Sequence, residues 1–331
     1  MIARKSDAAQ IRDALEGLKN SDWLGDARRW WPSFLFRFDD IQNAISILTC
    51  GHLRCRNKRG TAVETAATSI IAGTEARWKD HVRLYFRPRT PTQHHIEGIR
   101  PKGQLGSLEA HMPVPVFFLL DSAEVLTRET TMFSDGSLAA KHPNFVAGDF
   151  VAFARIPFAK VYHDSPLSDD EKANIMYHRH AEVVVPEELS LDGVLKYIWV
   201  RSEAERETLL NVLPADISKK YEPIIYASRA NLFFRKWTFL ERASLTQDLV
   251  DLAFNLSSIA PGPFHARLVI GYQANGMTLE LKWDETDFFA NRPFKIQIPQ
   301  LKGTQTEYTA TFYLDETIAF KGRYRPANVL V

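Results

Sequence analysis

The stretch from residue 176 to 186 is Met176-Tyr177-His178-Arg179-His180-Ala181-Glu182-Val183-Val184-Val185-Pro186, in which polar side chains lead directly into an apolar, β-branched run. Such a run is typical of a β-strand, whose side chains point alternately to its two faces. On a strand, His178, His180 and Glu182 would share one face. A carboxylate entering the hydrophobic centre of a sheet is costly to bury unless it is paired, so its position is typical of a functional site. Glu182 is therefore the first candidate for a catalytic residue.

Length and composition indicate a globular protein with more than one domain. The chain has 331 residues, of which 45% are hydrophobic and 24% are charged. No apolar run approaches the roughly 20 residues of a membrane span, and the N-terminus lacks the apolar core of a secretory signal. The two cysteines, Cys50 and Cys55, are too few for a disulfide scaffold. We therefore expect a cytoplasmic protein that does not span a membrane.

Positive charge is concentrated in the first third of the chain. Residues 1–104 hold 18 Lys and Arg against 11 Asp and Glu, an excess of seven, although the net charge of the whole chain is +1. This excess favours an anionic partner, either nucleic acid or a phosphorylated cofactor. The alternative is an ordinary solvated surface whose positive charge is balanced elsewhere in the fold. Residues 23–34 add three tryptophans and two arginines, which can stack on nucleobases or anchor this segment on the core.

The hydrophobic pattern of the first two thirds predicts an α+β domain. A helix over 6–20 is expected to begin at Ser6, and a second one, over 41–48, to begin at Asp39 or Asp40 and to end at Gly51. A third helix begins at Ser202. Residues 58–80 are interpreted as a partly helical loop. Strands are expected at 35–38, 52–54, 81–86, 115–121, 176–186, 194–200 and 222–226.

The last hundred residues have a different pattern. One helix is predicted over residues 245–259, and alternating strands follow, separated by Gly, Asn, Asp and Pro turns. This favours a small β-sandwich or barrel. The expected organisation is an N-terminal helical and aromatic segment at 1–34, an α+β domain at 35–230 and a β-rich domain at 235–331.

Four motifs occur in order along the α+β region. They are Phe36 to Leu53 with Gly51-x-Leu53, then Asp80-x-Val82-x-x-Tyr85-Phe86-x-Pro88-Arg89-x-Pro91, then Val116 to Ser122, and finally Ala181-Glu182-Val183-Val184 followed by Tyr197 to Val200. Together they resemble the DarT family of DNA ADP-ribosyltransferase toxins, over roughly residues 35–212. The resemblance implies a PARP-like mixed or antiparallel sheet and an NAD-dependent enzyme that modifies a base in single-stranded DNA.

The resemblance also implies that Glu182 is catalytic. Breaking the bond between nicotinamide and ribose builds positive charge on the ribose, as glycoside cleavage does. A nearby carboxylate can hold a ribose hydroxyl, stabilise this charge and accept a proton from the attacking base. Where the family commonly has an NAD-contacting histidine, this chain has Arg37, whose guanidinium can bind ribose or pyrophosphate. Cofactor contacts are expected for Phe36, Arg37, Asn43, Tyr85, Phe86 and Arg89. The alternatives are a structural role in the helix for Asn43, core positions for Tyr85 and Phe86, and a surface position beside prolines for Arg89.

The family has a base-facing arginine in a variable loop, and Arg77 is the nearest candidate here, with a catalytic and a nucleic-acid-binding role. Thymine N3 carries a proton that must leave, whereas the exocyclic amine of guanine can attack first and lose its proton afterwards. If Arg77 is not placed to assist, guanine is the easier acceptor, so guanine is slightly favoured and thymine is retained. Further nucleic-acid contacts are expected for Arg87, His178 and His180.

Other functions remain open on the sequence alone. His178-x-His180-x-Glu182, joined by His163 or His142, would suit a metal centre. Residues 235–331 would be the working part of a non-catalytic binding module, and a transferase of this kind can also act on RNA or protein. A toxin implies a neutralising partner, for which the resemblance suggests a macrodomain hydrolase like DarG.

Overall fold

The computed structural model describes residues 2–58, 64, 74–105, 110–140, 145–227, 231–274, 277–298 and 307–326. Most of the loop predicted at 58–80, and His142, lie outside these residues. The chain divides into two compact units, one of Met1–His95 with Phe117–Ile198 and the other of Ile96–Val116 with Trp199–Val331. Across the described parts of the chain, no helix is both long enough and apolar enough to cross a membrane.

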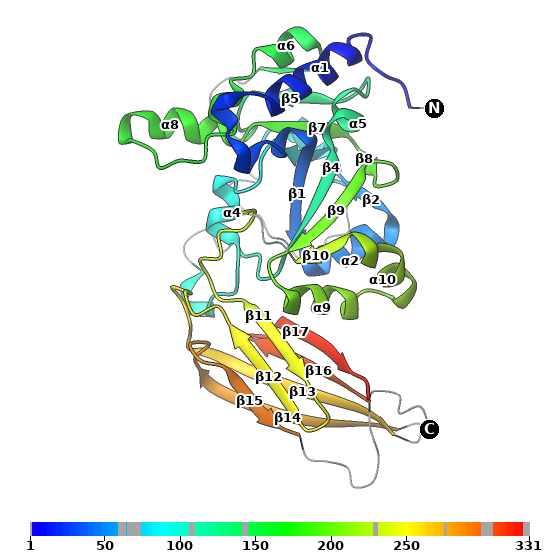
Figure 1. Cartoon of the computed structure of the whole chain (residues 1–331), viewed down its shortest axis with the longest axis vertical. Coiled ribbons are helices and arrows are strands. Elements are labelled where there is room, and N and C mark those ends of the chain that lie inside the picture. The colour runs from blue at the N-terminus through cyan, green and yellow to red at the C-terminus, as the bar shows by residue number, and fades with distance from the viewer. Residues whose placement is uncertain are drawn as a thin grey trace. The chain divides into compact units, whose positions relative to one another are not determined.

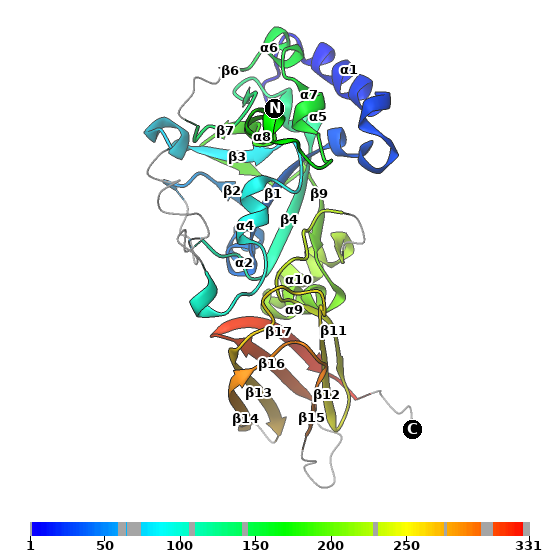
Figure 2. The ribbon, with the colours of Figure 1, turned by 90° about the vertical axis from the view of Figure 1, so that its left-hand side faces the viewer.

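Within the first unit, the strands of the main sheet follow the order β9-β4-β1-β3-β7-β5-β6 (Figures 1 and 2). The pairings of β1 with β3, β3 with β7 and β7 with β5 are antiparallel. β4 is the apolar strand predicted at 115–121. All of its residues are buried except the last one, which is partly exposed. β2 and β8 form a separate antiparallel pair. The strands are β1 (Phe34–Asp40), β2 (His52–Arg54), β3 (His81–Tyr85), β4 (Pro115–Asp121), β5 (Met132–Ser134), β6 (Val146–Ala147), β7 (Glu182–Pro186), β8 (Glu188–Ser190) and β9 (Leu195–Val200).

The helices of this unit are mostly short. α1 packs against α5 and α6 (Figure 2). Short 3-10 turns at Asp22–Leu24, Asp26–Arg28 and Trp31–Ser33 precede β1, and another at Ala76–Asp80 precedes β3. The predicted cap of α2 is confirmed, because the Asp40 side chain accepts a hydrogen bond from the amide of Gln42. The helices are α1 (Ala8–Lys19), α2 (Ile41–Cys50), α4 (Pro91–Ile96), α5 (Ser122–Leu126), α6 (Phe150–Ala154), α7 (Phe158–Val161) and α8 (Asp169–His178).

Gly51 ends α2 as predicted, with a left-handed φ of 71°. A side chain is strained in this conformation, so Gly51→Ala is expected to destabilise the first unit by about 1 kcal/mol. Gly17 lies inside α1, and no atom lies within 4 Å of where its Cβ would be. Gly17→Ala is therefore a matched control, expected to stabilise by up to about 1 kcal/mol. Thermal unfolding of the two variants should shift in opposite directions, and equal shifts would contradict this account.

The strand predicted over 176–186 is wrong in its first half. Residues up to His178 belong to α8, whose first turn carries Asp169, Asp170 and Glu171 and is thereby favoured by the helix dipole. The chain then turns, with the amide of Ala181 donating to the carbonyl of His178 at 2.9 Å. Strand β7 begins at Glu182, so the two histidines do not share a strand face with it.

In the described residues of the second unit, two α-helices occur with two open antiparallel sheets, whose strand orders are β11-β12-β15 and β14-β13-β16-β17. Ser202 caps α9 by accepting from the amide of Glu205, as predicted. The elements are α9 (Glu203–Val212), α10 (Ala215–Tyr221), β10 (Ile225–Ala227), β11 (Leu240–Leu245), β12 (Leu249–Phe254), β13 (Phe264–Ala274), β14 (Met277–Phe288), β15 (Phe294–Gln297), β16 (Tyr308–Leu314) and β17 (Thr317–Tyr324).

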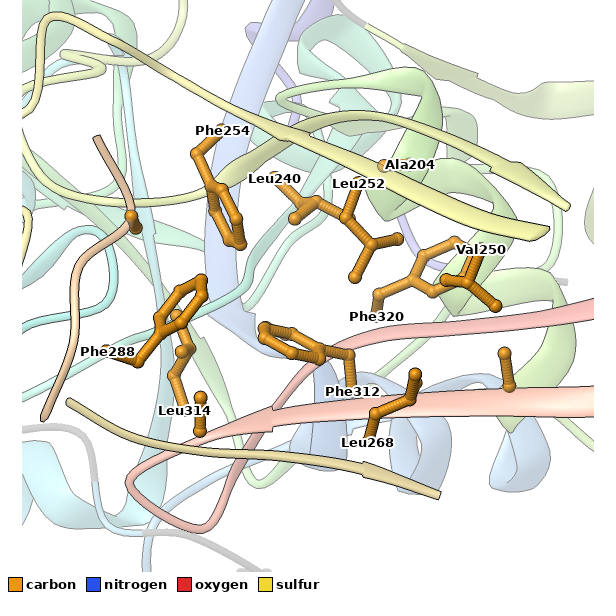
Figure 3. Packing of buried hydrophobic residues seen from close by; sticks show 14 of the residues in the cluster. Ala204, Leu240, Val250, Leu252, Phe254, Leu268, Phe288, Phe312, Leu314 and Phe320 are labelled. Atoms are coloured by element: carbon orange, nitrogen blue, oxygen red, sulfur yellow. The ribbon is translucent and has the colours of Figure 1, made fainter. Parts of the chain in front are cut away.

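Both sheets of this unit contribute to one hydrophobic core. Figure 3 shows Leu252 and Phe254 of β12 together with Leu268, Phe312 and Phe320 of the other sheet. Burying each such side chain contributes roughly 1.5–3 kcal/mol before conformational entropy is counted. The barrel alternative is not supported, because neither sheet closes on itself.

The helix predicted over 245–259 is wrong. Val250, Leu252 and Phe254 are buried at every second position, which is the period of a strand. A turn that is closed by a hydrogen bond from the Thr246 amide to the Leu249 carbonyl, at 2.9 Å, joins β11 to β12. The cross-strand pairing buries these residues on one face and overrides the helical interpretation.

Candidate active site

Glu182 is the first residue of β7, and 1% of its surface is exposed. It lies directly opposite Tyr85 on β3, two residues beyond Arg83. Arg83 forms hydrogen bonds with both carboxylate oxygens of Glu182. Its Nε donates to Oε2, and its Nη2 donates to Oε1 at 2.5 Å. The amide of Leu138 adds a third donor to Oε1 at 3.2 Å. A two-pronged ion pair of this kind fixes the plane of the carboxylate as well as its position.

The charge of Glu182 stabilises the charged form of Arg83. Burial opposes the charge on Arg83, but the adjacent Glu182 carboxylate overcomes this effect and raises the pKa of Arg83 above its ordinary value. Burial, together with the charge of Glu182, raises the pKa of Tyr85 to about 12. The Tyr85 hydroxyl therefore keeps its proton at neutral pH and is a hydrogen-bond donor beside the carboxylate. The ring of Tyr85 stacks on Phe38 with 5.8 Å between the ring centroids.

Arg83 was not predicted as a site residue. It occupies a variable position of the motif that begins at Asp80, so the family resemblance gives it no role. One signal was available, because residues 83 and 85 lie on the same face of a strand. Their position opposite Glu182 depends on the pairing of β3 with β7, which joins segments about a hundred residues apart in the sequence.

Arg37 and Asn43 are brought together by Asp39, which was predicted only as a possible helix cap and not as a site residue. Arg37 forms an ion pair with Asp39 at 2.5 Å, and the side-chain amide of Asn43 donates to the other carboxylate oxygen of Asp39 at 2.7 Å. Arg37 also donates to the carbonyl of Arg83 at 3.3 Å, which links this group to the strand of the Arg83–Glu182 pair. The Arg37 guanidinium is partly exposed, whereas Asp39 and Asn43 are buried. An arginine held in this way presents a fixed positive charge, as binding a ribose or a phosphate requires.

The two phenylalanines predicted to contact the cofactor lie in the core. Phe36 is fully buried against Trp30 and Phe117. Phe86 is buried against two other aromatic rings, those of Phe153 and Phe158. For Phe86, this is the core position that was the alternative. Phe36 has no exposed surface that a cofactor could contact.

Arg87 is buried, which disagrees with its predicted contact with nucleic acid. Its guanidinium is 1% exposed and forms an ion pair with Asp164 at 2.7 Å. It also donates to the carbonyl of Val161 at 3.1 Å and to that of His163. Burial and neighbouring arginines lower the pKa of Arg87 to about 10, so it remains charged at neutral pH. Arg89 shares the same carboxylate at 3.1 Å and is partly exposed.

The remaining predicted residues occupy separate environments. Arg77 is about two thirds exposed, forms an ion pair with Glu75 at 2.8 Å and lies over the ring of Trp78. His178 is buried, with Nδ1 2.6 Å from the carbonyl of Asp135. His180 bridges the carbonyl of Met176, at 2.9 Å, and the hydroxyl of Thr92, at 3.3 Å, and burial lowers its pKa.

The alternative metal centre is not formed by the residues that the structure describes. No group of three or more His, Cys, Asp or Glu side chains among them is arranged to hold a metal ion. Glu182 is instead bound to Arg83, and His178 faces a backbone carbonyl.

The chain is similar to known proteins in sequence and in structure. Residues 36–234 match a family model described as "ssDNA thymidine ADP-ribosyltransferase, DarT". Among solved structures, DarT of Thermus sp. 2.9 is matched in complex with ADP-ribosylated ssDNA, with 16% identity, a TM-score of 0.46 and coverage of 61% of this chain and 97% of that one. The same protein with NAD+ is matched at 15% identity and a TM-score of 0.44, covering 61% and 98%. Among curated proteins, none matched.

The family match spans more than half of the chain, and it contains both strands that carry the Arg83–Glu182 pair. It ends close to the start of the β-rich part of the second unit, which it leaves unassigned. This chain belongs to the DarT family of NAD-dependent ADP-ribosyltransferases.

Proposed function

We propose that the protein transfers ADP-ribose from NAD to a base of single-stranded DNA, with Glu182 as the catalytic residue. The observation that carries the proposal is the buried carboxylate of Glu182, which accepts hydrogen bonds from Nε and Nη2 of Arg83 and from the backbone amide of Leu138. Because these donors fix the carboxylate before substrate arrives, it need not be reorganised during the reaction. The description of the matched family names single-stranded DNA, which supports DNA as the acceptor.

The reaction exchanges one bond to the ribose for another. The C–N bond between ribose and nicotinamide breaks, and its electron pair leaves with the nicotinamide. A nitrogen of the acceptor base then forms the new bond to the same ribose carbon and loses its proton. In this proposal, Glu182 accepts a hydrogen bond from a ribose hydroxyl, stabilises the positive charge of the transition state and takes up that proton.

Further residues are proposed to bind the cofactor. Arg37, held by Asp39, carries a fixed charge that suits the ribose or pyrophosphate of NAD. Tyr85, a protonated donor opposite Glu182, is proposed to line the site of the nicotinamide ribose.

The base that accepts ADP-ribose is proposed to be thymine, because the description of the matched family names thymidine. Guanine is the second candidate, favoured by the position of Arg77, which pairs with Glu75 and stacks on Trp78. The experiment is to incubate the protein with NAD and single-stranded oligonucleotides of each base composition and to measure their intact mass. A gain of one ADP-ribose is expected on thymine-containing strands. If every oligonucleotide keeps its mass, the proposal is wrong.

Replacing Arg77 tests whether it assists the reaction at thymine. If it helps to remove the N3 proton, Arg77→Ala should lower transfer to thymine about 10²-fold, within the range of one acid–base group. Transfer to guanine, where no proton need leave before attack, should change much less. The ratio of the two initial rates is the measurement. Equal losses on both bases would show that Arg77 has no role in choosing the base.

We also propose that the protein is a toxin and that a macrodomain hydrolase related to DarG neutralises it. Modification of DNA bases harms the cell that makes the enzyme, so an unopposed active enzyme should arrest growth. Expression of the wild type is expected to stop growth, and expression of Glu182→Gln is expected to permit it. Normal growth of cells that contain active, folded wild-type protein would contradict the toxin role.

A further inference from the structure

Four arginines of the first unit converge on the segment from Val161 to Ser165. Arg87 is buried beneath it and donates to two of its backbone carbonyls. Arg28 donates to the carbonyl of Tyr162 at 2.7 Å. Arg179 donates from one nitrogen to His163 Nδ1 at 2.7 Å and to the carbonyl of Ser165 at 2.9 Å. Arg89 reaches the same segment through Asp164.

The charge of this arginine cluster, Arg28, Arg87, Arg89 and Arg179, is not balanced. Asp164 forms ion pairs with Arg87 and Arg89, while Arg28 and Arg179 have no carboxylate partner in the part of the chain that the structure describes. His163 adds no charge at neutral pH, because burial and the neighbouring arginines lower its pKa. Glu171 of α8 also acts on His163. At neutral pH, the four arginines and the two acids leave a net positive charge.

The arrangement suits an anion with several oxygen atoms. Arg28, Arg89 and Arg179 are partly exposed, whereas Arg87 is buried and supports the segment from below. The Nε of Arg179 is buried and has no hydrogen-bond partner in the structure. Guanidinium groups form two-pronged hydrogen bonds with carboxylate and phosphate oxygens, so the partly exposed Arg28, Arg89 and Arg179 suit a phosphate as ligand.

An exposed aromatic ring lies beside these arginines. Trp23 is 42% exposed and stacks on Tyr162 at 6.4 Å between ring centroids. Its carbonyl accepts a hydrogen bond from Arg28 at 3.2 Å. Positive charge along a backbone path, with an aromatic ring on which a base can stack, is the combination that single-stranded nucleic acids require.

The cluster is continuous with the candidate active site. His180 lies in the turn between Arg179 and Glu182, and its ring contacts Thr92 in α4, which follows Arg89 in the chain. The charges of Glu182, Arg83 and Arg87 all act on this ring. A strand whose phosphates contact the arginines is therefore close to Glu182.

We infer that Arg28, Arg89 and Arg179, together with the exposed ring of Trp23, form a binding surface for the backbone phosphates and one base of the acceptor strand. This inference rests on the proposed function, in which the acceptor is single-stranded DNA. Phosphate is also present in the pyrophosphate of NAD, so the test must separate the two sources.

The test measures the affinity of the full-length protein for a short fluorescent single-stranded oligonucleotide, without NAD, at several salt concentrations. Arg179→Gln is expected to weaken binding about tenfold, since it removes charge-assisted hydrogen bonds. The slope of log affinity against log salt should decrease by about 0.7, the value for one phosphate contact with a single strand. Arg179→Lys should restore the slope. Trp23→Ala should weaken binding by about fivefold or more and leave the slope unchanged.

The controls separate this surface from a general loss of charge or of fold. Arg155→Gln removes one exposed positive charge elsewhere on the first unit and should leave both affinity and slope unchanged. Thermal unfolding identifies any variant that fails to fold, and Arg28→Gln then confirms the result at a second position. The KM for NAD of the arginine variants should stay within about twofold of the wild-type value. A larger rise would indicate that these arginines bind the pyrophosphate of NAD.

Three outcomes would overturn the inference. They are an unchanged salt slope in folded Arg179→Gln, an equal effect of Arg155→Gln, and a rise in the KM for NAD without any loss of DNA binding. The proposed function is tested separately by the mass of the oligonucleotide. If the wild type modifies DNA while Arg179→Gln binds it normally, this inference alone is wrong. If DNA binds through the arginines but gains no ADP-ribose, the proposed function is wrong and the binding surface stands.

Discussion

Glu182→Gln is expected to lower the rate of ADP-ribose transfer about 10³-fold, which lies within the range for one acid–base group. The amide keeps the shape of the carboxylate but cannot carry its charge or accept a proton from the base. The initial rate of nicotinamide release in the presence of the oligonucleotide measures this loss. Because catalysis and stability can change together, thermal unfolding of the variant must be recorded as well.

The matched control is Glu188→Gln. Glu188 lies in β8, close in sequence to Glu182, but its side chain is about half exposed and it pairs with Arg54 at 3.7 Å. The rate of ADP-ribose transfer by Glu188→Gln should stay within about twofold of the wild-type rate, since exposed ion pairs contribute little to stability. A Glu182→Gln variant that keeps more than about a tenth of the wild-type rate would contradict the catalytic assignment.

Arg83→Met is expected to be the most destabilising replacement at the site. It leaves the buried Glu182 carboxylate with the Leu138 amide but without its ionic partner. Loss of one partner of a buried pair costs about 3–5 kcal/mol, and the partial exposure of Arg83 favours the lower end of this range. Urea unfolding of the variant measures the loss. Transfer should also fall, about 10²-fold, because the carboxylate is no longer held in one orientation.

A double-mutant cycle isolates the contribution of the pair. In the Glu182→Gln background, Arg83→Met leaves no buried carboxylate without its ionic partner. Arg83→Met should therefore lower the free energy of unfolding by at least about 1 kcal/mol less than it does in the wild type. Arg54→Met removes an exposed ion pair and should change stability by no more than about 0.5 kcal/mol. Additive effects of the Arg83 and Glu182 replacements would show that the two side chains are not coupled.

Much of the fold could be predicted because its signals are local. The apolar run at 115–121 becomes β4, and the Asp40 cap and the glycine at 51 delimit α2. Two local interpretations failed. At 176–178 the chain is still in α8, whose acidic first turn favours a helix, and at 245–259 pairing between strands outweighs the helical pattern.

The candidate site was harder to predict because its contacts are not local. Glu182 was identified from the resemblance and from its position before three valines. Arg83 and Asp39 were missed, since each acts through a partner whose position depends on strand pairing or on a helix start. Arg87 was predicted to contact nucleic acid, yet it is buried, and Asp164 and three backbone carbonyls accept its hydrogen bonds. Sequence alone does not show which charges are paired.

The most direct measurement is the structure of this protein with a non-hydrolysable analogue of NAD. The account predicts that an oxygen of Glu182 lies within hydrogen-bond distance, about 2.6–3.2 Å, of a hydroxyl on the ribose that carries the nicotinamide. Arg83 should still contact the carboxylate from its other side. A bound analogue whose ribose lies beyond the reach of Glu182, even through one water molecule, would contradict the central claim.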